Sequence, residues 1–209
     1  MHKFNNSPRH TKMFRLVMLS LLMAMVIILQ LIGCIPQISA NKLSFVLVPI
    51  VLGGAMLGIG AGAWLGFLFG VIVYLGGLFG LDSATAFLIS LQPLGTLVIC
   101  LGKGVLAGLG AGCIYRLISR KNAIAGVVAA AAAAPIINTG LYCVFMMTMF
   151  KDTLIKSYGL SANAGFFAGL WFIFLLVLVN FLVELGINLV LCPGIAIALK
   201  RSKSIPFFK

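Results

Sequence analysis

The stretch that decides the fold runs from Gly169 to Lys200 and reads GLWFIFLLVLVNFLVELGINLVLCPGIAIALK. It is apolar almost throughout and is longer than a helix needs to cross a bilayer, so it predicts a transmembrane helix. Asn180, Glu184 and Asn188 interrupt it at four-residue intervals, a spacing that places all three side chains on one helical face. Because an ionisable group inside a membrane is costly, we expect this face to line a cavity or to meet a partner group.

The composition extends this prediction to the whole chain. Of the 209 residues, 62% are hydrophobic and 9% are charged, and the mean hydropathy is +1.20. Apolar runs of membrane length recur, which predicts an all-α membrane protein with a single small membrane domain. The domain is expected to span residues 14–199, between basic tails at 1–13 and 200–209. Glycine, proline and polar breaks divide it into six predicted spans, at about 14–33, 44–57, 60–78, 93–118, 124–149 and 164–199.

Most basic residues flank the apolar spans, which explains the formal charge of +12 without a nucleic-acid partner. Six spans place both termini on the same side of the membrane. The two tails and the connection between the fourth and fifth spans hold most of the lysines and arginines. By the positive-inside rule, we predict that these basic segments, and therefore both termini, are cytoplasmic.

The residue inventory gives no support to an enzyme, a metal site or a cofactor. His2 and His10, the only histidines, lie in the N-terminal tail, and the five cysteines are scattered without a CxxC motif. The sequence contains no phosphate-binding glycine loop and no HExxH motif. Hydrolysis of ATP would therefore have to come from other subunits.

Small residues recur at four-residue intervals in several spans. Such ridges allow two helix backbones to approach closely in lipid, either inside the protein or against another membrane subunit. Ser20 and Ala24 form a weaker ridge of this kind in the first span. The stronger ridges consist of Gly54, Gly58, Gly62, Gly66 and Gly70, and of Gly104, Gly108 and Gly112.

Polar residues on three separate spans are predicted to lie at one depth in the membrane. Lys103 lies about 20 Å of helix from the cytoplasmic end of its span, and Asn138 and Glu184 lie about 25 Å and about 24 Å from theirs. Asn180 lies one turn further out than Glu184. The outer half of the same region also contains Thr96, Thr139 and Tyr142.

Two interpretations of this polar group stay open. Lys103 and Glu184 form a structural pair that only neutralises two buried charges, or they form the floor of an outward-facing site for a solute with a carboxylate or hydroxyl group. Trp171 and Tyr142 are either interface anchors or rings that stack on the ligand. The motif PIINTG at 135–140 is either a harmless kink or a local break that exposes backbone groups to the cavity.

Three segments resemble the substrate-binding S components of energy-coupling factor (ECF) vitamin transporters. They read SFVLVPIVLGGAMLGIGAGAWLGFLFG (44–70), PIINTG (135–140) and NFLVELGINLVLCP (180–193). Together with the six short spans, they extend the resemblance over nearly the whole chain. Within the family, the chain is most similar to the pantothenate/folate-type group.

The resemblance implies an S-component-like bundle in the bacterial plasma membrane. It implies that a water-soluble vitamin, with pantothenate as the first candidate, is captured from outside beneath the first outer loop and beside the last three spans. A membrane T component and two cytosolic ATPase subunits are the implied partners. The family's Ala-x-x-x-Ala motif for the T component corresponds to Ser20 and Ala24, and the loop Cys34–Leu43 corresponds to a lid.

The candidate substrate residues are drawn from spans four to six. They are Thr96, Lys103, Asn138, Thr139, Tyr142, Trp171, Asn180 and Glu184. Two other functions compete with vitamin capture. In the first, the chain is an autonomous secondary carrier or channel for a small anionic solute, with Lys103 and Glu184 as a relay. In the second, it is a membrane scaffold in which this pair has no role in binding.

Overall fold

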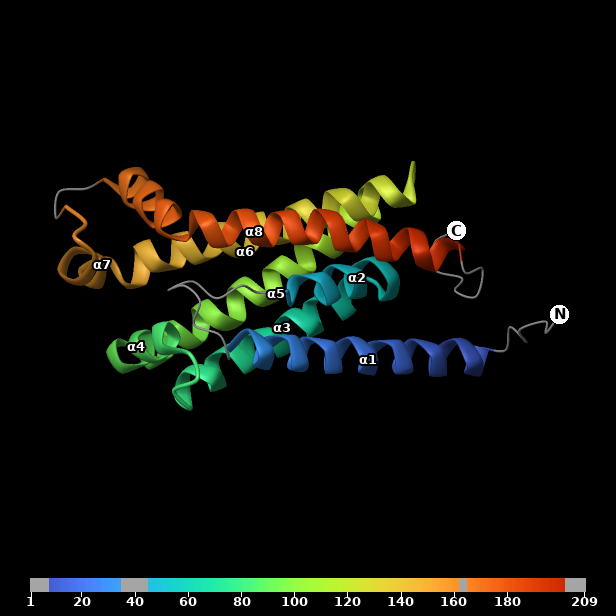
Figure 1. Ribbon diagram of the computed structural model, residues 1–209, viewed down its shortest axis with the longest axis horizontal. Helices are drawn as coiled ribbons and strands as arrows, with labels where there is room; N and C mark the ends of the chain where they lie inside the picture. The colour runs from blue at the N-terminus through green and yellow to red at the C-terminus, as the bar shows by residue number, and fades with distance from the viewer. Residues whose placement is uncertain (1–7, 35–44, 162–164, 202–209) are drawn as a thin grey trace.

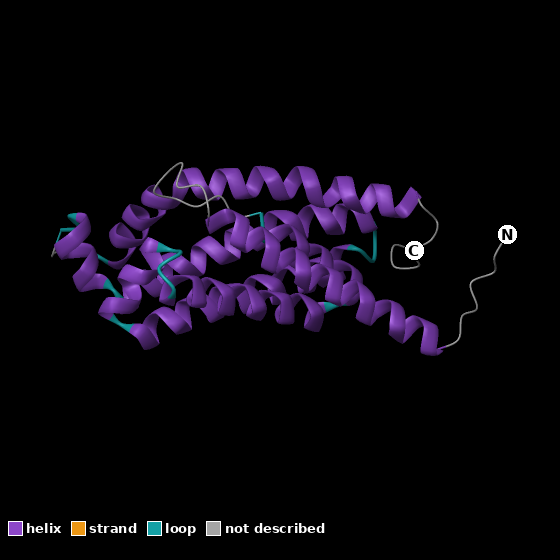
Figure 2. Cartoon of the chain, turned by 60° about the horizontal axis from the view of Figure 1, so that its bottom comes forward, coloured by secondary structure: helices purple, strands orange, loops and turns teal. Residues whose placement is uncertain are grey.

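Helices make up almost all of the computed structural model, which describes residues 8–34, 45–161 and 165–201. Within these ranges there are eight helices, joined by short connections, and no strand (Figure 2). The helices are α1 (Pro8–Cys34), α2 (Leu47–Leu57), α3 (Ile59–Leu78), α4 (Ser83–Leu91), α5 (Pro93–Ile118), α6 (Ala123–Met149), α7 (Lys151–Tyr158) and α8 (Phe166–Arg201). The predicted all-α class is confirmed.

Five of the described helices, α1, α3, α5, α6 and α8, are long and apolar enough to cross a membrane. The second predicted span, 44–57, differs, because α2 has only 11 residues and is therefore about 16 Å long, roughly half the hydrocarbon thickness of a bilayer. The apolar run at 44–57 continues into the next span, and the break at Gly58 shortens the helix. Gly58 has a φ of 103°, a conformation that favours glycine.

The short helix α2 lies in the middle of the bundle. All eleven of its residues are buried, and it contacts α1, α3, α5, α6 and α8. A helix that is apolar on every side suits a position surrounded by other helices or by lipid, and the contacts of α2 place it among helices. The apolar core around α2 includes Val26 of α1, Leu65 of α3, Val127 of α6 and Cys192 of α8.

The glycine ridges hold α3 against α5. A Cβ atom on Gly62 would lie 2.7 Å from the carbonyl oxygen of Gly108, and one on Gly70 would lie 2.5 Å from that of Cys100. A Cβ atom on Gly66 would collide with the carbonyl oxygen of Gly104. The two backbones therefore touch directly, and the ridges serve internal packing, the first of the two roles that the spacing predicted.

Both ends of the described chain lie at the same end of the bundle. In Figure 1 the first turns of α1, the last turns of α8 and the connection between α5 and α6 lie at the right, and α4 and α7 lie at the left. The predicted placement of both termini on one side agrees with this arrangement. That this side is cytoplasmic remains a prediction from the distribution of basic residues.

Several helix boundaries differ from those expected. Helix α1 begins at Pro8, within the expected tail 1–13, and the connections at 79–92 and after span five contain α4 and α7. Asp82 begins α4, because its carboxylate accepts hydrogen bonds from the backbone amide and hydroxyl of Thr85. Helix α6 is continuous through Pro135, so the PIINTG motif does not break it. The expected lid, apart from the end of α1, lies outside the described residues.

Candidate functional site

A layer of polar side chains separates two apolar cores. On α6, Asn138 and Thr139 lie between Ala134, which belongs to the core around α2, and Cys143, which belongs to the other core. That second core lies toward α4 and α7, and on α8 it begins at Ile173. Asn180, Glu184 and Asn188 follow Ile173 along α8 and precede the core around α2. The layer therefore lies within the protein, with apolar packing on either side.

Helix α8 contributes a chain of hydrogen bonds centred on Glu184, which is 3% exposed. The Nδ2 of Asn180 donates to Glu184 Oε1 at 3.3 Å, and the Nδ2 of Asn188 donates to the backbone oxygen of Glu184 at 2.8 Å. The four-residue spacing seen in the sequence makes both contacts possible. Asn188 is fully buried, and the thiol of Cys192 lies 3.7 Å from its Oδ1. The contacts of Asn188 described here are thus within α8, whereas Asn180 Oδ1 and Glu184 Oε2 accept no hydrogen bond from the described residues.

Lys103 is held by two aromatic rings from neighbouring helices. Its Nζ lies 5.8 Å from the ring centroid of Phe69 on α3 and 5.4 Å from that of Tyr142 on α6. Both distances suit a cation–π interaction, which stabilises an ammonium group without using its hydrogens. In the described part of the chain the ammonium forms no hydrogen bond. Its three N–H donors are therefore available to a carboxylate.

Lys103 and Glu184 attract each other without a direct hydrogen bond. The two groups are close enough for an electrostatic interaction. Nevertheless, Glu184 Oε2 is buried and has no hydrogen-bond partner among the described residues. Within the described residues no direct bond joins the two charges, and one carboxylate oxygen stays unpaired.

Two further buried atoms are unpaired in the same layer. They are the Oδ1 atoms of Asn138 and Asn180, and neither has a hydrogen-bond partner within the described ranges. Asn138 is one helical turn from Tyr142, on the face of α6 that reaches Lys103. A buried polar atom without a partner costs about 1–3 kcal/mol. Three such acceptors beside an unpaired ammonium are the arrangement that a polar solute would complete.

Other predicted residues contribute less directly. Thr139 is buried beside Asn138. Thr96 is also buried, but its hydroxyl donates to the backbone oxygen of Gln92 at 2.9 Å, in the first turn of α5. Trp171 is 63% exposed and its ring lies 5.7 Å from that of Phe174. Nine residues, about two and a half turns, separate Trp171 from Asn180, so the two lie on opposite faces of α8. Trp171 therefore suits a membrane-interface anchor better than a ligand contact.

The predicted partner ridge lies on the surface of α1. Ser20 and Ala24 are both exposed, and the hydroxyl of Ser20 donates to the backbone oxygen of Leu16 at 3.0 Å. This bond leaves the surface of the ridge small and apolar. Of the membrane-length window in α1, only 17% is buried inside the bundle. The helix thus has most of its surface available to lipid or to another membrane protein.

Phe69 is the site residue that the sequence analysis missed. The glycine pairs fix α3 antiparallel to α5, with Gly66 against Gly104 and Gly70 against Cys100. This register brings Phe69 to the level of Lys103. The two glycine ridges were visible in the sequence. The contact between Phe69 and Lys103 follows only once the two ridges are known to pack against each other.

The fold defines a multi-pass helical membrane protein with a buried layer of polar side chains. The family model of the ECF transporter substrate-specific component matches residues 14–196. The chain belongs to this family and is therefore a substrate-specific membrane subunit of an ECF transporter, as the resemblance predicted. No curated protein matches the chain at a significant level.

Proposed function

We propose that this subunit captures a water-soluble vitamin, with pantothenate as the first candidate, from outside the cell for ATP-driven uptake. The observation that supports this most strongly is the set of unpaired groups in the polar layer. Asn138, Asn180 and Glu184 each have a buried acceptor atom without a partner. Lys103 adds a cation held by aromatic rings only.

The unpaired groups define the chemistry of the solute. The ammonium of Lys103 needs an anion, for which a carboxylate is the natural partner. The three acceptor atoms need hydrogen-bond donors, and an asparagine amide can also donate to a solute oxygen. Pantothenate carries a carboxylate at one end, and hydroxyl groups and an amide N–H along its length. A single extended molecule of this kind could accept a hydrogen bond from Lys103 and donate hydrogen bonds to the three acceptor atoms at the same time.

Energy for uptake is proposed to come from partner subunits. The small ridge at Ser20 and Ala24 is exposed on α1, which supports contact with a membrane T component that is bound in turn by two cytosolic ATPases. The small side chains would let a partner helix approach the α1 backbone closely. The bacterial plasma membrane is the proposed location.

Direct binding measurements test this proposal. The full chain, purified in a neutral detergent, should release a vitamin that mass spectrometry identifies, and the apo protein should bind that vitamin saturably in calorimetry. Pantothenate is titrated first, with its C-terminal amide as a matched uncharged ligand. Asn138→Leu and Asn180→Leu should each weaken binding about tenfold, because a solute donor then loses its acceptor. Val179→Leu, at an exposed neighbour of Asn180, is the control. The absence of saturable binding of any vitamin would contradict the proposal.

A further inference from the structure

A second polar site lies at the C-terminal end of α5, about 20 Å along that helix from Lys103. Here the turn between α2 and α3, the start of α1 and the end of α5 surround a pocket of about 620 Å³. We call it the basic pocket, since two arginines line it. Its lining also includes Leu57, Gly58, Gly60 and Ser119. The pocket exists because the break at Gly58 and the neighbouring glycines leave no side chains to fill the space: a Cβ atom on Gly60 would have nothing within 4 Å.

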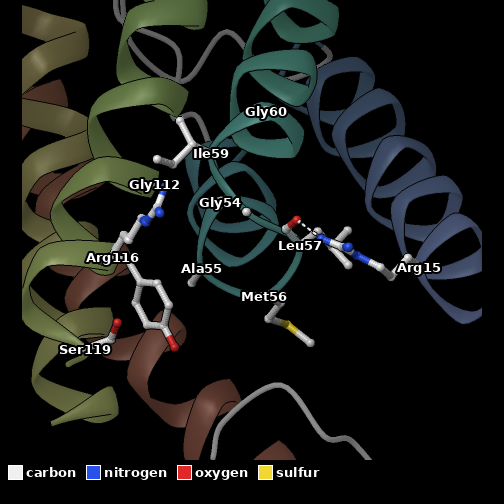
Figure 3. Close-up of a pocket in the computed structure, with 12 residues that line it drawn as sticks. Arg15, Gly54, Ala55, Met56, Leu57, Ile59, Gly60, Gly112, Arg116 and Ser119 are labelled. Atoms are coloured by element: carbon white, nitrogen blue, oxygen red, sulfur yellow. Dashed lines mark hydrogen bonds between the residues drawn. The ribbon is translucent and has the colours of Figure 1, made fainter. Parts of the chain in front are cut away.

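The two arginines enter the basic pocket from helices on opposite sides (Figure 3). The Nη2 of Arg15 on α1 donates to the backbone oxygen of Leu57 at 2.7 Å. This contact satisfies a free carbonyl at the end of α2 and positions the guanidinium group. Arg116, in the last turn of α5, forms no hydrogen bond within the described residues. Arg15 is thus fixed by one hydrogen bond and has N–H donors left over. All the N–H donors of Arg116 are available to a ligand.

The electrostatics of the basic pocket favour an anion. The chain has three acidic residues, and none lines this pocket. Asp82 caps α4, Asp152 is in the first turn of α7 and Glu184 is in the middle of α8. Helix α3 begins at Ile59, whereas α2 ends at Leu57 and Arg116 lies in the last turn of α5, so one positive and two negative helix ends meet at the pocket. The attraction for an anion therefore comes from the two arginines.

We infer that the basic pocket binds a phosphate group, and that the source of this phosphate is the headgroup of an anionic phospholipid. Guanidinium groups match phosphate oxygens in geometry and charge. Basic pockets between transmembrane helices are a recurrent form of headgroup site. Leu16 and Val17 follow Arg15 on α1, on its membrane-interior side, and both are exposed. They would contact the acyl chains of a lipid but would add nothing to the binding of a free phosphate ion.

Native mass spectrometry of the full chain tests the site. The protein is exchanged into nanodiscs of phosphatidylcholine with or without phosphatidylglycerol, then released into neutral detergent, and the retained phosphatidylglycerol is counted. Arg116→Gln should lower this retention about fivefold, the effect expected of one basic residue beside an anionic lipid. Arg120→Gln is the matched control, because Arg120 is exposed, lies four residues further along and does not line the pocket.

A variant that fills the basic pocket tests whether the lipid binds in the pocket or is only attracted by the positive charge. Gly60→Phe changes no charge and has room for its Cβ, so it should reduce retention as strongly as Arg116→Gln. A thermal melt of each variant excludes unfolding. Arg116 is a better target than Arg15, because the Arg116 guanidinium forms no hydrogen bond in the described structure, whereas Arg15 bonds to Leu57. Equal retention in wild type, Arg116→Gln and Gly60→Phe would overturn the inference.

Titration of inorganic phosphate into lipid-free protein distinguishes the two sources of the anion. The lipid assignment predicts weak binding of inorganic phosphate and strong retention of phosphatidylglycerol. Tight binding of inorganic phosphate that Arg116→Gln abolishes, without any lipid preference, would overturn the lipid source. Loss of partner-subunit assembly in Arg116→Gln with unchanged lipid retention would likewise overturn it and would assign the pocket to an acidic protein segment.

Discussion

Lys103 is the residue on which the proposed substrate chemistry depends most. Aromatic rings on α3 and α6 face its ammonium, and Glu184 lies within electrostatic range of it without a hydrogen bond. An ammonium held in this way keeps its N–H donors available to a ligand. A structural lysine that merely neutralised Glu184 would be expected to use those donors on the carboxylate. The geometry therefore favours a role in binding.

Lys103→Met is expected to distinguish a carboxylate ligand from a neutral one. The variant should weaken binding of the vitamin acid by about 10- to 100-fold, because a charge-assisted hydrogen bond contributes about 1.5–3 kcal/mol. Binding of the matched amide should change by less than about threefold. Calorimetric titration of both ligands gives the comparison. Lys121→Met, at an exposed basic residue after α5, should alter neither affinity, and equal losses for acid and amide would assign Lys103 a structural role.

Stability measurements address the competing structural role of the same two charges. If Lys103 balances Glu184, Lys103→Met leaves a buried carboxylate uncompensated and should lower stability by up to about 3 kcal/mol. Lys103→Met combined with Glu184→Gln should recover most of that loss, since the remaining buried group is neutral. Thermal unfolding in detergent of the wild type, both single variants and the double variant completes the cycle. Additive effects of the two substitutions would show that the charges are independent.

At the scale of helices, direct backbone contact between α3 and α5 positions the site. Gly66 packs on Gly104 and Gly62 on Gly108, and this register brings Phe69 beneath Lys103. A membrane interior offers little hydrophobic force to drive helices together, so close packing of small residues has to provide the association. The glycine ridges therefore determine the relative positions of Phe69 and Lys103 by backbone packing alone.

Gly66→Ala should destabilise the bundle by about 1–3 kcal/mol, because its methyl group meets the backbone of α5 and cannot be accommodated by a side-chain rotation. Gly140→Ala on α6 is the matched control, since a Cβ atom there has nothing within 4 Å. That control should be neutral or stabilising by up to about 1 kcal/mol through helix propensity. Thermal unfolding measures both variants. A Gly66→Ala protein as stable as the Gly140→Ala protein would contradict the close packing of α3 on α5.

The sequence predicted this packing in kind but not in detail. Four-residue glycine spacing predicted close helix contacts, and the four-residue polar spacing on α8 predicted a shared face for Asn180 and Glu184. Both depend on local helical geometry alone. The end of α2 at Leu57 was predicted from the glycines that follow, but its burial by five other helices could not be, because an apolar run has the same pattern whether lipid or protein surrounds it. The contact of Phe69 with Lys103 depends on pairing between helices, which one sequence does not encode locally.

For the whole molecule, the arrangement favours a subunit over an independent carrier. The described residues bury a polar layer between two apolar cores. Helix α1 has little of its surface inside the bundle, and its small ridge is exposed. An autonomous carrier would be expected to cover such a helix or to pair it with a second half of the same chain. Lipid could cover the same surface, and α8 is even less buried than α1. A partner at the ridge is therefore a proposal that rests on the family and on the small residues of the ridge.

Transport by reconstituted protein decides between these two functions. Liposomes containing this chain alone should take up no radiolabelled vitamin above background, whereas liposomes that also contain the T component and both ATPases should take it up when ATP is supplied. Ala24→Leu should abolish that uptake and leave vitamin binding unchanged, because it blocks close approach to α1 without altering the polar layer. Met25→Leu, at a neighbouring exposed position, should transport normally. Uptake by the chain alone would instead establish an autonomous carrier, with Lys103 and Glu184 as its natural relay.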